Sequence, residues 1–526
     1  MTKKLLLLVI MLLVSIPIIV SLSNHAFAQS VDTAWVRRYN GPGNWSDYAY
    51  ALAVDRSGNI YVTGGSYGSG TSYDYATIKY YPNGDTAWVK RYNGPSNWYD
   101  YAYAIAVDDS GNVYVTGKID TLVGKAYYSD YATIKYFSNG DTAWVRRYNG
   151  PGNAFDEAYA IAVNGFGNVY VTGYSIKDTS HPYNADYATI KYFLNGDTAW
   201  IRRYNGPGNS WDVATAIVLD DSNNVYVTGY SSGSGTNKDY ATIKYSSNGD
   251  TIWVRRYNGA GDSTDVATAI AIDTSGNVYV TGYSFDSGPY EDFVTIKYYQ
   301  NGDTAWIRRY NGERNGYDEA SAIAIDGSGN VYVTGYSSGT GTVNDYATIK
   351  YYPNGDTAWV RRYDGPGNLD DEAYAIAVDD YDNVYVTGFS HGTGTYYDYA
   401  TIKYDTLGNQ LLVKRYNGPG NELDVATAMA IDDSGNIYVT GYSYSWMTGC
   451  DYATIKYVEL QFLRGDCDKN GNIDLVDVIL LANYILKGGP APIPLQSGDV
   501  NCDGKYDLVD VIKLARYVLF GELLPC

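Results

Sequence analysis

Short segments that alternate apolar and polar residues recur through most of the chain, and Gly, Asn and Asp dominate the stretches between them. Alternation of this kind, bounded by turn residues, predicts β-strands. One complete period contains four such segments, which are Ala49–Asp55, Asn59–Gly64, Asp74–Tyr80 and Thr86–Tyr92. Four strands in a period of about 50 residues are typical of a β-propeller blade.

The period occurs eight times. A Trp in "WVRRYNG" or a close variant marks seven copies, and Leu412 takes the eighth place; the tryptophans are Trp35, Trp88, Trp144, Trp200, Trp253, Trp306 and Trp359. In the first segment of each period, small residues such as Ala49, Ala51 and Ala53 alternate with larger ones. Small side chains suit the crowded strand nearest a propeller axis, so we predict that this segment is the innermost strand and the Trp segment the outermost.

The order of the segments predicts how the ring closes. An outermost segment, Thr33–Tyr39, precedes the first innermost strand, whereas none follows the last inner segment, Asp451–Tyr457. We therefore expect the N-terminal strand to complete the C-terminal blade, which leaves no open sheet edge. The predicted fold of residues 31–457 is all-β, an eight-bladed β-propeller closed by the N-terminal strand.

The repeat motif, for example "AYAIAVDDSGNVYVTG" at Ala102–Gly117, resembles the bacterial SBBP-type β-propeller repeats, which are related to the seven-bladed-propeller family. The resemblance extends over roughly Val31–Tyr457, although we count eight units here. It implies the fold but not an activity, because propellers carry many unrelated functions.

Three charged positions recur in every period, and Arg38, Asp47 and Lys79 are their first copies. A catalytic site needs one asymmetric group of residues rather than eight equal ones. We therefore interpret these positions as Arg–Asp and Lys–Asp pairs between neighbouring blades, since charges on covered strands need partners.

Function is expected where the repeats differ, in the loops that follow the second and fourth strands, including the long segments 118–130 and 174–186. Aromatic residues there could stack on sugar rings, anchor a protein partner or only cap the blades; the candidate ligand-binding residues are Trp45, Trp98, Tyr99, Trp211 and Trp446. Acidic residues also break the repeat, and two of them could form an acid/base pair like that of a glycoside hydrolase; they are Asp120, Glu157, Asp178, Asp286, Glu313, Glu319, Glu372 and Glu422.

Two matching segments, Gly465–Leu486 and Gly498–Leu519, follow a short junction at 458–464. Each places oxygen-bearing residues at alternate positions, then a Gly, then an acid at position 12, which predicts an EF-hand-type calcium loop leading into one helix. The predicted ligands of two Ca²⁺ ions are Asp466, Asp468, Asn470, the carbonyl of Asn472, Asp474 and Asp477, and Asp499, Asn501, Asp503, the carbonyl of Lys505, Asp507 and Asp510.

This loop-and-helix pair resembles a type I dockerin module, so residues 465–526 are predicted to be a small α-helical calcium module. The resemblance implies binding to a cohesin-like protein. Positions 10 and 11 of each loop, where dockerins contact their partner and often carry Ser-Thr, are Leu475 and Val476 in the first loop and Leu508 and Val509 in the second.

The N-terminus combines Lys3 and Lys4, an apolar run and Ala26-Phe27-Ala28, which predicts a cleaved bacterial signal peptide at residues 1–28, with an uncleaved membrane anchor as the alternative. The net charge of −20 disfavours nucleic acid and anionic membranes as partners. The cysteines, Cys450, Cys467, Cys502 and Cys526, allow three disulfide pairings in an exported protein, among which we favour Cys502–Cys526.

Together these features predict a secreted or cell-surface, monomeric, non-catalytic binding or scaffolding protein, whose propeller binds a glycan or a protein. The alternative is a polysaccharide-active enzyme, a glycoside hydrolase or lyase with an appended dockerin. The chain has only three histidines, one of them in the predicted signal peptide, and no localised catalytic motif. These features favour the binding protein.

Overall fold

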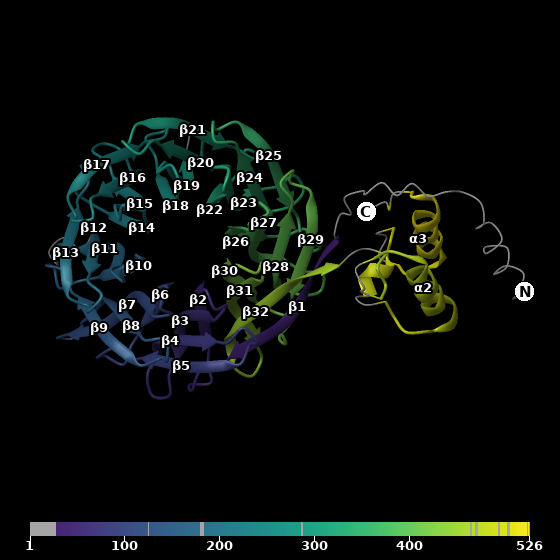
Figure 1. The fold of residues 1–526 in the computed structure, drawn as a ribbon. Coiled ribbons are helices and arrows are strands. Elements are labelled where there is room, and N and C mark those ends of the chain that lie inside the picture. The colour runs from purple at the N-terminus through teal and green to yellow at the C-terminus, as the bar shows by residue number, and fades with distance from the viewer. Residues whose placement is uncertain are drawn as a thin grey trace, which may run out of the picture. The chain divides into compact units, whose positions relative to one another are not determined.

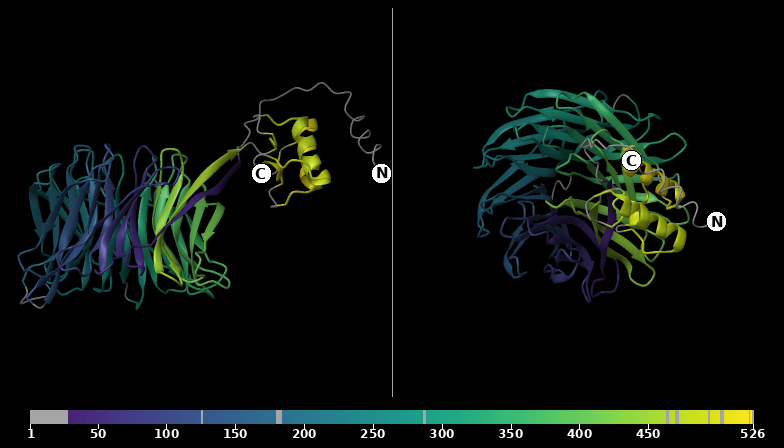
Figure 2. Two further views of the ribbon diagram at one scale, coloured as in Figure 1. Left: turned by 90° about the horizontal axis from the view of Figure 1, so that it is seen from below. Right: turned by 45° about the vertical axis from the view of Figure 1, so that its right-hand side comes forward.

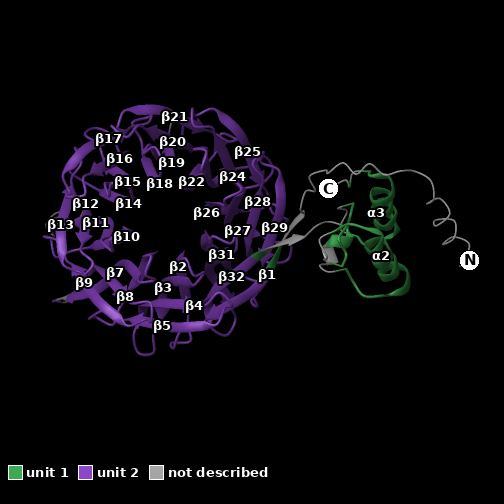
Figure 3. Ribbon diagram, in the orientation of Figure 1, with its two compact units in different colours: residues 1–32, 458–526 green, residues 33–457 purple. Residues whose placement is uncertain are grey.

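The computed structural model describes residues 28–124, 126–178, 184–285, 288–462, 465–468, 472–492, 495–501, 505–522 and 524. The chain divides into two compact units, residues 33–457 and residues 1–32 with 458–526 (Figure 3). The predicted signal peptide lies almost wholly outside the described residues. None of the described helices is long and apolar enough to cross a membrane.

The first unit is a ring of eight four-stranded antiparallel sheets (Figure 1). From the innermost strand outward, blades 1 to 4 are β2 (Asp47–Val54), β3 (Ile60–Tyr67), β4 (Tyr73–Tyr80) and β5 (Thr86–Tyr92); β6 (Tyr101–Val107), β7 (Val113–Val123), β8 (Ala126–Tyr136) and β9 (Thr142–Tyr148); β10 (Asp156–Val163), β11 (Val169–Ile176), β12 (Ala185–Tyr192) and β13 (Thr198–Tyr204); and β14 (Asp212–Leu219), β15 (Val225–Ser232), β16 (Lys238–Tyr245) and β17 (Thr251–Tyr257).

Blades 5 to 8 follow the same order: β18 (Asp265–Ile272), β19 (Val278–Phe285), β20 (Glu291–Tyr298) and β21 (Thr304–Tyr310); β22 (Asp318–Ile325), β23 (Val331–Ser338), β24 (Asn344–Tyr351) and β25 (Thr357–Tyr363); β26 (Asp371–Val378), β27 (Val384–His391), β28 (Tyr397–Tyr404) and β29 (Gln410–Tyr416); and β30 (Asp424–Ile431), β31 (Ile437–Ser445), β32 (Gly449–Phe462) and β1 (Ala28–Tyr39). The N-terminal strand β1 is the outermost strand of blade 8, so the predicted eight-bladed ring and its closure are confirmed.

Each innermost strand contains a β-bulge. In blade 1 the pairing of β2 with β3 shifts between Ala49 and Ala51, so Tyr50 has no partner on β3. The glycine opposite is required because a Cβ on Gly64 would lie 1.9 Å from the carbonyl oxygen of Tyr48. The bulge turns one side chain per blade out of the regular alternation on the strands nearest the axis.

The hydrophobic core lies between neighbouring blades. Trp200 of blade 3, for example, packs between Tyr170 and Tyr245, with ring centroids 6.1 Å away in both cases. Trp35 on β1 makes the equivalent contacts with Tyr438 and Tyr80, at 6.3 and 6.0 Å. The junction that closes the ring is therefore packed like a junction within it.

The prediction that the recurrent charges pair between blades is wrong. Arg91 on β5 bonds Asp74 on β4 of the same blade at 2.8 Å, because the third and fourth strands are adjacent. Asp47 instead accepts the backbone N–H groups of Gly41 and Tyr67. Lys79 does reach the next blade, where its Nζ donates to the carbonyl of Ser138 rather than to an aspartate.

The long segment 118–130 is mostly strand rather than loop, because β7 and β8 pair as far as Val123 and Ala126. In side view the strands of each blade run between the two ends of the ring (Figure 2). The turns after the first and third strands lie at one end of the ring. The loops after the second and fourth strands lie at the other, which we name the variable end.

The second unit contains helices α2 (Leu475–Lys487) and α3 (Leu508–Phe520) and the short 3-10 helix η1 (Leu495–Gly498). Asp474 and Asp507 cap the N-termini of the two helices, each in a reciprocal capping box with the aspartate three residues later. The small core between the helices consists of Cys467, Val478, Leu481, Val500 and Leu514. Cys450 and Cys467 are both buried free thiols, and Cys502 and Cys526 lie outside the described residues.

Candidate functional site

The turns opposite the variable end are occupied by their own hydrogen bonds. A pocket of about 330 Å³ between blades 4 and 5 is lined there by Asp220 and Asp273, among others. The side chain of Asp220 accepts hydrogen bonds from Asn224 and Tyr226, and Asp273 is used in the same way. These carboxylates hold turns together, which leaves the variable end as the candidate binding surface.

Seven aromatic rings form a continuous series at the variable end of blades 2 and 3. Each ring centroid lies within 6.3 Å of the next, and we call the series the aromatic arc; it consists of Trp98, Tyr99, Tyr101, Tyr103, Tyr159, Tyr174 and Trp211. It begins in the loop between β5 and β6, crosses the innermost strands β6 and β10, and ends immediately before β14. Trp98 and Tyr99 are exposed and Tyr174 is buried, so the arc runs from the surface into the core and offers flat apolar faces to a ligand at its exposed end.

Four members of the arc were not among the residues that the sequence pointed to. Tyr101 and Tyr103 on β6, Tyr159 on β10 and Tyr174 on β11 would be assigned to the propeller core by their repeat context. The sequence nevertheless shows that these positions vary between repeats, because Tyr103 and Tyr159 occupy the bulge position at which blades 4, 5 and 8 have Thr. Those threonines link blades instead, as when Thr215 donates to the carbonyl of Ala267 at 2.8 Å.

The other predicted aromatic residues are placed differently. Trp45 contacts Tyr67, which joins it to the arc through Tyr73. Trp446 is 71% exposed and its ring contacts Tyr444, and no contact that the structure describes connects this pair to the arc. The structure thus brings together Trp45, Trp98, Tyr99 and Trp211 of the five candidates.

Glutamates occupy equivalent positions on three innermost strands. Glu157 on β10 is neutralised within the protein, because Lys118 Nζ lies 3.1 Å from its Oε1 and Tyr159 donates to its Oε2. Glu372 on β26 accepts hydrogen bonds from the side chains of Tyr374 and Asn344, at 2.9 and 3.4 Å. Among the residues that the structure describes, the hydrogen-bond donors to Glu372 are therefore neutral.

The third glutamate, Glu319 on β22, faces a second acid. Glu291 begins β20 of the preceding blade, and its carboxyl group lies within hydrogen-bonding reach of that of Glu319. Burial, and then the neighbouring Glu319, raise the pKa of Glu291 to about 8. Burial and a hydrogen bond to Glu319 also raise the pKa of Tyr336. We call Glu291, Glu319 and Glu372 the acidic cluster.

The sequence treated these carboxylates as loop residues, which is wrong for several of them: Asp120, Glu157, Glu319 and Glu372 lie on strands β7, β10, β22 and β26. The strands are longer at the variable end than the apolar pattern indicated, because polar residues there still pair with the next strand. Glu291, the partner of Glu319, was missed, and Asp286 lies outside the described residues.

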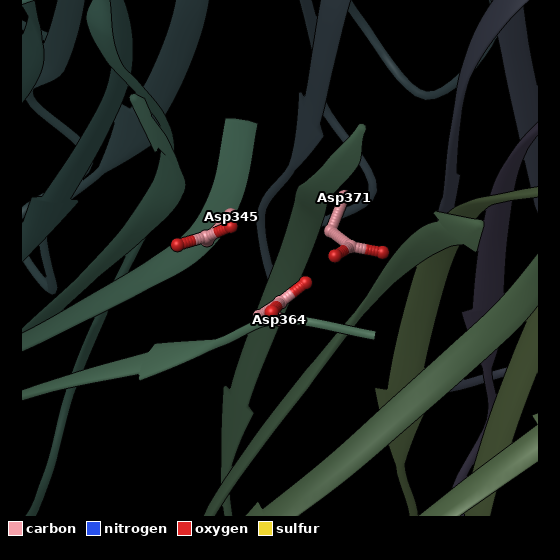
Figure 4. A group of neighbouring side chains, drawn as sticks. All are labelled: Asp345, Asp364 and Asp371. Carbon is pink, nitrogen blue, oxygen red and sulfur yellow. The ribbon is translucent and has the colours of Figure 1, made fainter. Parts of the chain in front are cut away.

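A second acidic group lies between blades 6 and 7, where Asp345, Asp364 and Asp371 place one oxygen each within 4.8 Å of one another (Figure 4). Asp364 replaces the Asn of the other seven repeats. The neighbours of Asp364 already have partners, since Asp345 pairs with Arg362 at 2.8 Å and Asp371 accepts the N–H of Gly365 at 2.7 Å.

In the first predicted calcium loop, Asp466, Asp468 and Asp477 bring one oxygen each within 4.8 Å of one another. Asp477 is fully buried at the start of α2, where its Oδ1 accepts the N–H of Cys467 and its Oδ2 that of Asp474. The loop thus wraps around the closing aspartate and gathers the hard oxygen ligands that calcium prefers. Asn470 lies outside the described residues.

The second loop repeats this arrangement. Asp510 is fully buried, its Oδ1 accepts the N–H of Asn501 at 3.3 Å, and its Oδ2 accepts that of Asp507 at 2.9 Å. Asp507 in turn caps α3 through Val509. Asp503 lies outside the described residues. The described donor set of the first loop fits a calcium ion, and the second loop shares the buried closing aspartate.

The first turn of each helix exposes an apolar patch. Leu475 and Val476 on α2, and Leu508 and Val509 on α3, are 45–50% exposed. The isoleucine one turn later in each helix, Ile479 and Ile512, is exposed as well, which the sequence reading did not include. Each isoleucine is three and four residues after the two earlier positions and so lies beside both on the helix surface, and each half of the module presents an equivalent patch.

Comparison with known proteins identifies both parts of the chain. Residues 464–519 match the type I dockerin domain, a calcium-binding module of secreted or cell-surface proteins that binds cohesin-type partners. Six segments match the SBBP β-propeller repeat, at 34–70, 87–121, 252–285, 305–341, 358–394 and 413–445.

More distant similarities accompany these matches. An uncharacterized WD repeat-containing protein of Acanthamoeba polyphaga mimivirus is 24% identical over 448 residues, which are 69% of this chain but 31% of that protein, so the chain spans about a third of its relative. Solved structures include a PL25 ulvan lyase (10% identity, 72% of this chain and 95% of that one, TM-score 0.39) and a Dyadobacter fermentans protein of unknown function (9%, 81% and 98%, TM-score 0.38).

Proposed function

Because the chain joins SBBP β-propeller repeats to a type I dockerin domain, we propose that it is an exported, non-catalytic adaptor. The dockerin domain attaches it, in the presence of calcium, to a cohesin-type partner. The variable end of the propeller holds a glycan. The predicted signal peptide supports export, and the continuous aromatic arc is the observation that supports the glycan.

The arc suits a carbohydrate because sugar rings present flat C–H faces that stack on aromatic side chains. Trp98 and Tyr99 at one end of the arc are about 40% exposed, so a ligand can reach them. Trp98 also stacks on Tyr127 of the extended β7–β8 hairpin at 5.1 Å, which holds its ring in place. Rings held rigidly lose little conformational entropy when a ligand binds.

In the dockerin domain we propose that the two loops bind one Ca²⁺ ion each, through the residues named above. The apolar patches beside Leu475 and Leu508 are proposed as the partner surface. They differ from the Ser-Thr pair often found there, so the matching cohesin surface should be apolar rather than rich in hydrogen-bonding groups.

The test is to incubate the purified mature protein, with calcium, with a panel of soluble polysaccharides, and to measure both retention and the release of reducing or unsaturated ends. We expect retention without release. Trp98→Ala should weaken retention at least tenfold, whereas Trp446→Ala, equally aromatic but outside the arc, should not change it. If both variants are retained as well as the parent protein, binding at the arc is contradicted. If no glycan retains the parent protein, the search turns to protein partners.

A polysaccharide-active enzyme is the second candidate, and the Glu291–Glu319 pair is the observation that favours it. A carboxyl group that keeps its proton near neutral pH can serve as a general acid. If chain ends are released, and if Glu319→Gln abolishes the release, the protein is an enzyme rather than an adaptor.

A further inference from the structure

Glu319 and Glu372 carry negative charge that no described lysine, arginine or histidine neutralises, whereas Glu291 keeps its proton near neutral pH. By contrast Glu157, which occupies the same position on its innermost strand as Glu319 and Glu372, forms an ion pair with Lys118, whose Nζ lies 3.1 Å from its Oε1. Glu291, Glu319 and Glu372 have no lysine, arginine or histidine partner among the described residues. Glu291 meets Glu319, which also meets the neutral phenol of Tyr336, and Glu372 accepts from the neutral side chains of Tyr374 and Asn344.

Glu291 is the most buried member, with 5% of its surface exposed. Its Oε2 has no hydrogen-bond donor among the described residues. A buried carboxyl oxygen without a hydrogen-bond partner is costly, because it has lost its contact with water and gained no other. Because the carboxyl group of Glu291 also meets that of Glu319, a hydrogen-bond donor is missing where the two acids lie together.

The cluster and the aromatic arc are neighbours on the variable end. Tyr230 of blade 4 packs with Tyr159 and Trp211 of the arc against one apolar cluster. Burial, then the charges of Glu319 and Glu291 and the phenol of Tyr230, raise the pKa of Tyr283 of blade 5 to about 12. The innermost strands β14, β18 and β22 are neighbours around the ring, so a ligand that lies along the arc as far as Trp211 can extend past blade 5 to the acids.

We propose that the acidic cluster binds the protonated primary amine of an amino-sugar unit in a glycan held on the aromatic arc. This inference rests on the proposed glycan-binding function and specifies its ligand class. A primary ammonium has three N–H donors and no acceptor, so it complements surroundings that offer carboxylate oxygens. A divalent metal ion fits less well, since calcium takes six to eight oxygens and, among the described residues, Tyr336 is the further oxygen-bearing side chain shown to bond this pair.

The decisive comparison is between fully deacetylated glucosamine oligomers and N-acetylglucosamine oligomers of the same length, which share a backbone and differ in the amine. Isothermal titration of the full mature protein, with calcium and in mildly acidic buffer, should show about tenfold or greater preference for the free amine. The preference should shrink as salt is added, because the interaction is between charges.

Glu319→Gln should remove this preference, so that the two oligomers bind equally tightly. Glu291→Gln should have a smaller effect, because Glu291 keeps its proton in this buffer. Glu157→Gln is the matched control, because its carboxylate already pairs with Lys118. Thermal melting of each variant verifies folding, and Glu372→Gln provides an independent change at the same surface.

Several outcomes would overturn the inference. Equal affinities for the two oligomers would refute it and leave glycan binding standing. Binding of the free-amine oligomer that persists in Glu319→Gln would place the amine elsewhere. A lysine oligopeptide that binds as tightly, with the same dependence on Glu319, would show that the ligand is a protein. Failure of every glycan in the panel would refute the proposed function itself.

Discussion

Replacing Trp35 with Ala tests the closure of the ring, because this residue belongs to the N-terminal strand that completes blade 8. Trp35 is 8% exposed, packs between Tyr438 and Tyr80, and donates from its indole nitrogen to the carbonyl of Pro82 at 3.1 Å. These contacts join the last blade to the first. If β1 is as firmly held as any internal strand, the substitution must cost as much as it does inside the ring.

The magnitude follows from the buried surface. A buried aromatic side chain removes about 150–250 Å² from water, which at about 25 cal/mol per Å² contributes about 4–6 kcal/mol. Relaxation around the cavity reduces the expected loss to about 3–5 kcal/mol. Trp200→Ala is the matched control, since Trp200 is also 8% exposed and donates to the carbonyl of Ser247 at 3.2 Å.

Denaturant unfolding of both variants and the parent, followed by tryptophan fluorescence and circular dichroism, gives the comparison. We expect the two variants to lose stability to within about 1 kcal/mol of each other. A loss below about 1 kcal/mol for Trp35→Ala, beside the full loss for Trp200→Ala, would mean that β1 leaves the ring readily. Hydrogen exchange of the β1 amides would then be fast, and the argument for a closed ring would fail.

Three further predictions concern calcium, partner binding and pH. Chelation should lower the helicity of the dockerin domain, and Asp477→Ala and Asp510→Ala should each remove one bound ion, as counted by metal analysis of the dialysed protein; two ions in either variant would refute the ligand assignment. Changing both Leu475 and Leu508 to Glu should weaken capture by a cohesin at least tenfold in a binding assay, whereas either single change should have a small effect if the two halves are equivalent. Burial raises the pKa of Asp100 to about 7, and the pKa of its counterparts to about 6 in most blades. These protonated carboxyl groups therefore stabilise the fold fully at a pH below their unfolded-state pKa of about 3.8. The stabilisation is lost as the pH rises through their folded-state pKa. The melting temperature of the propeller should therefore rise as the pH falls from about 8 to about 5, and a fall over that range would contradict the assignment.

The sequence by itself determined the number of blades, the order of strands and the closure of the ring. Strand alternation and turn residues are local properties, and eight copies of one pattern repeat them with little ambiguity. Closure followed from counting, since the outermost segment at Thr33–Tyr39 precedes the first innermost strand and none follows the last blade. The type I dockerin domain was equally recognisable, because its motif occupies a short run of consecutive positions in each half.

The tertiary structure decided which side chains meet. Glu291 and Glu319 belong to different blades, and their contact depends on the angle between adjacent sheets and on strands that run further than their apolar pattern suggests. The bulge on each innermost strand brings Tyr103 and Tyr159 into one series of rings, which simple alternation does not predict. Arg91 likewise pairs within its blade because strand adjacency, rather than recurrence, sets its partner. Contacts between blades arise from packing over long sequence distances, where a local pattern carries no information.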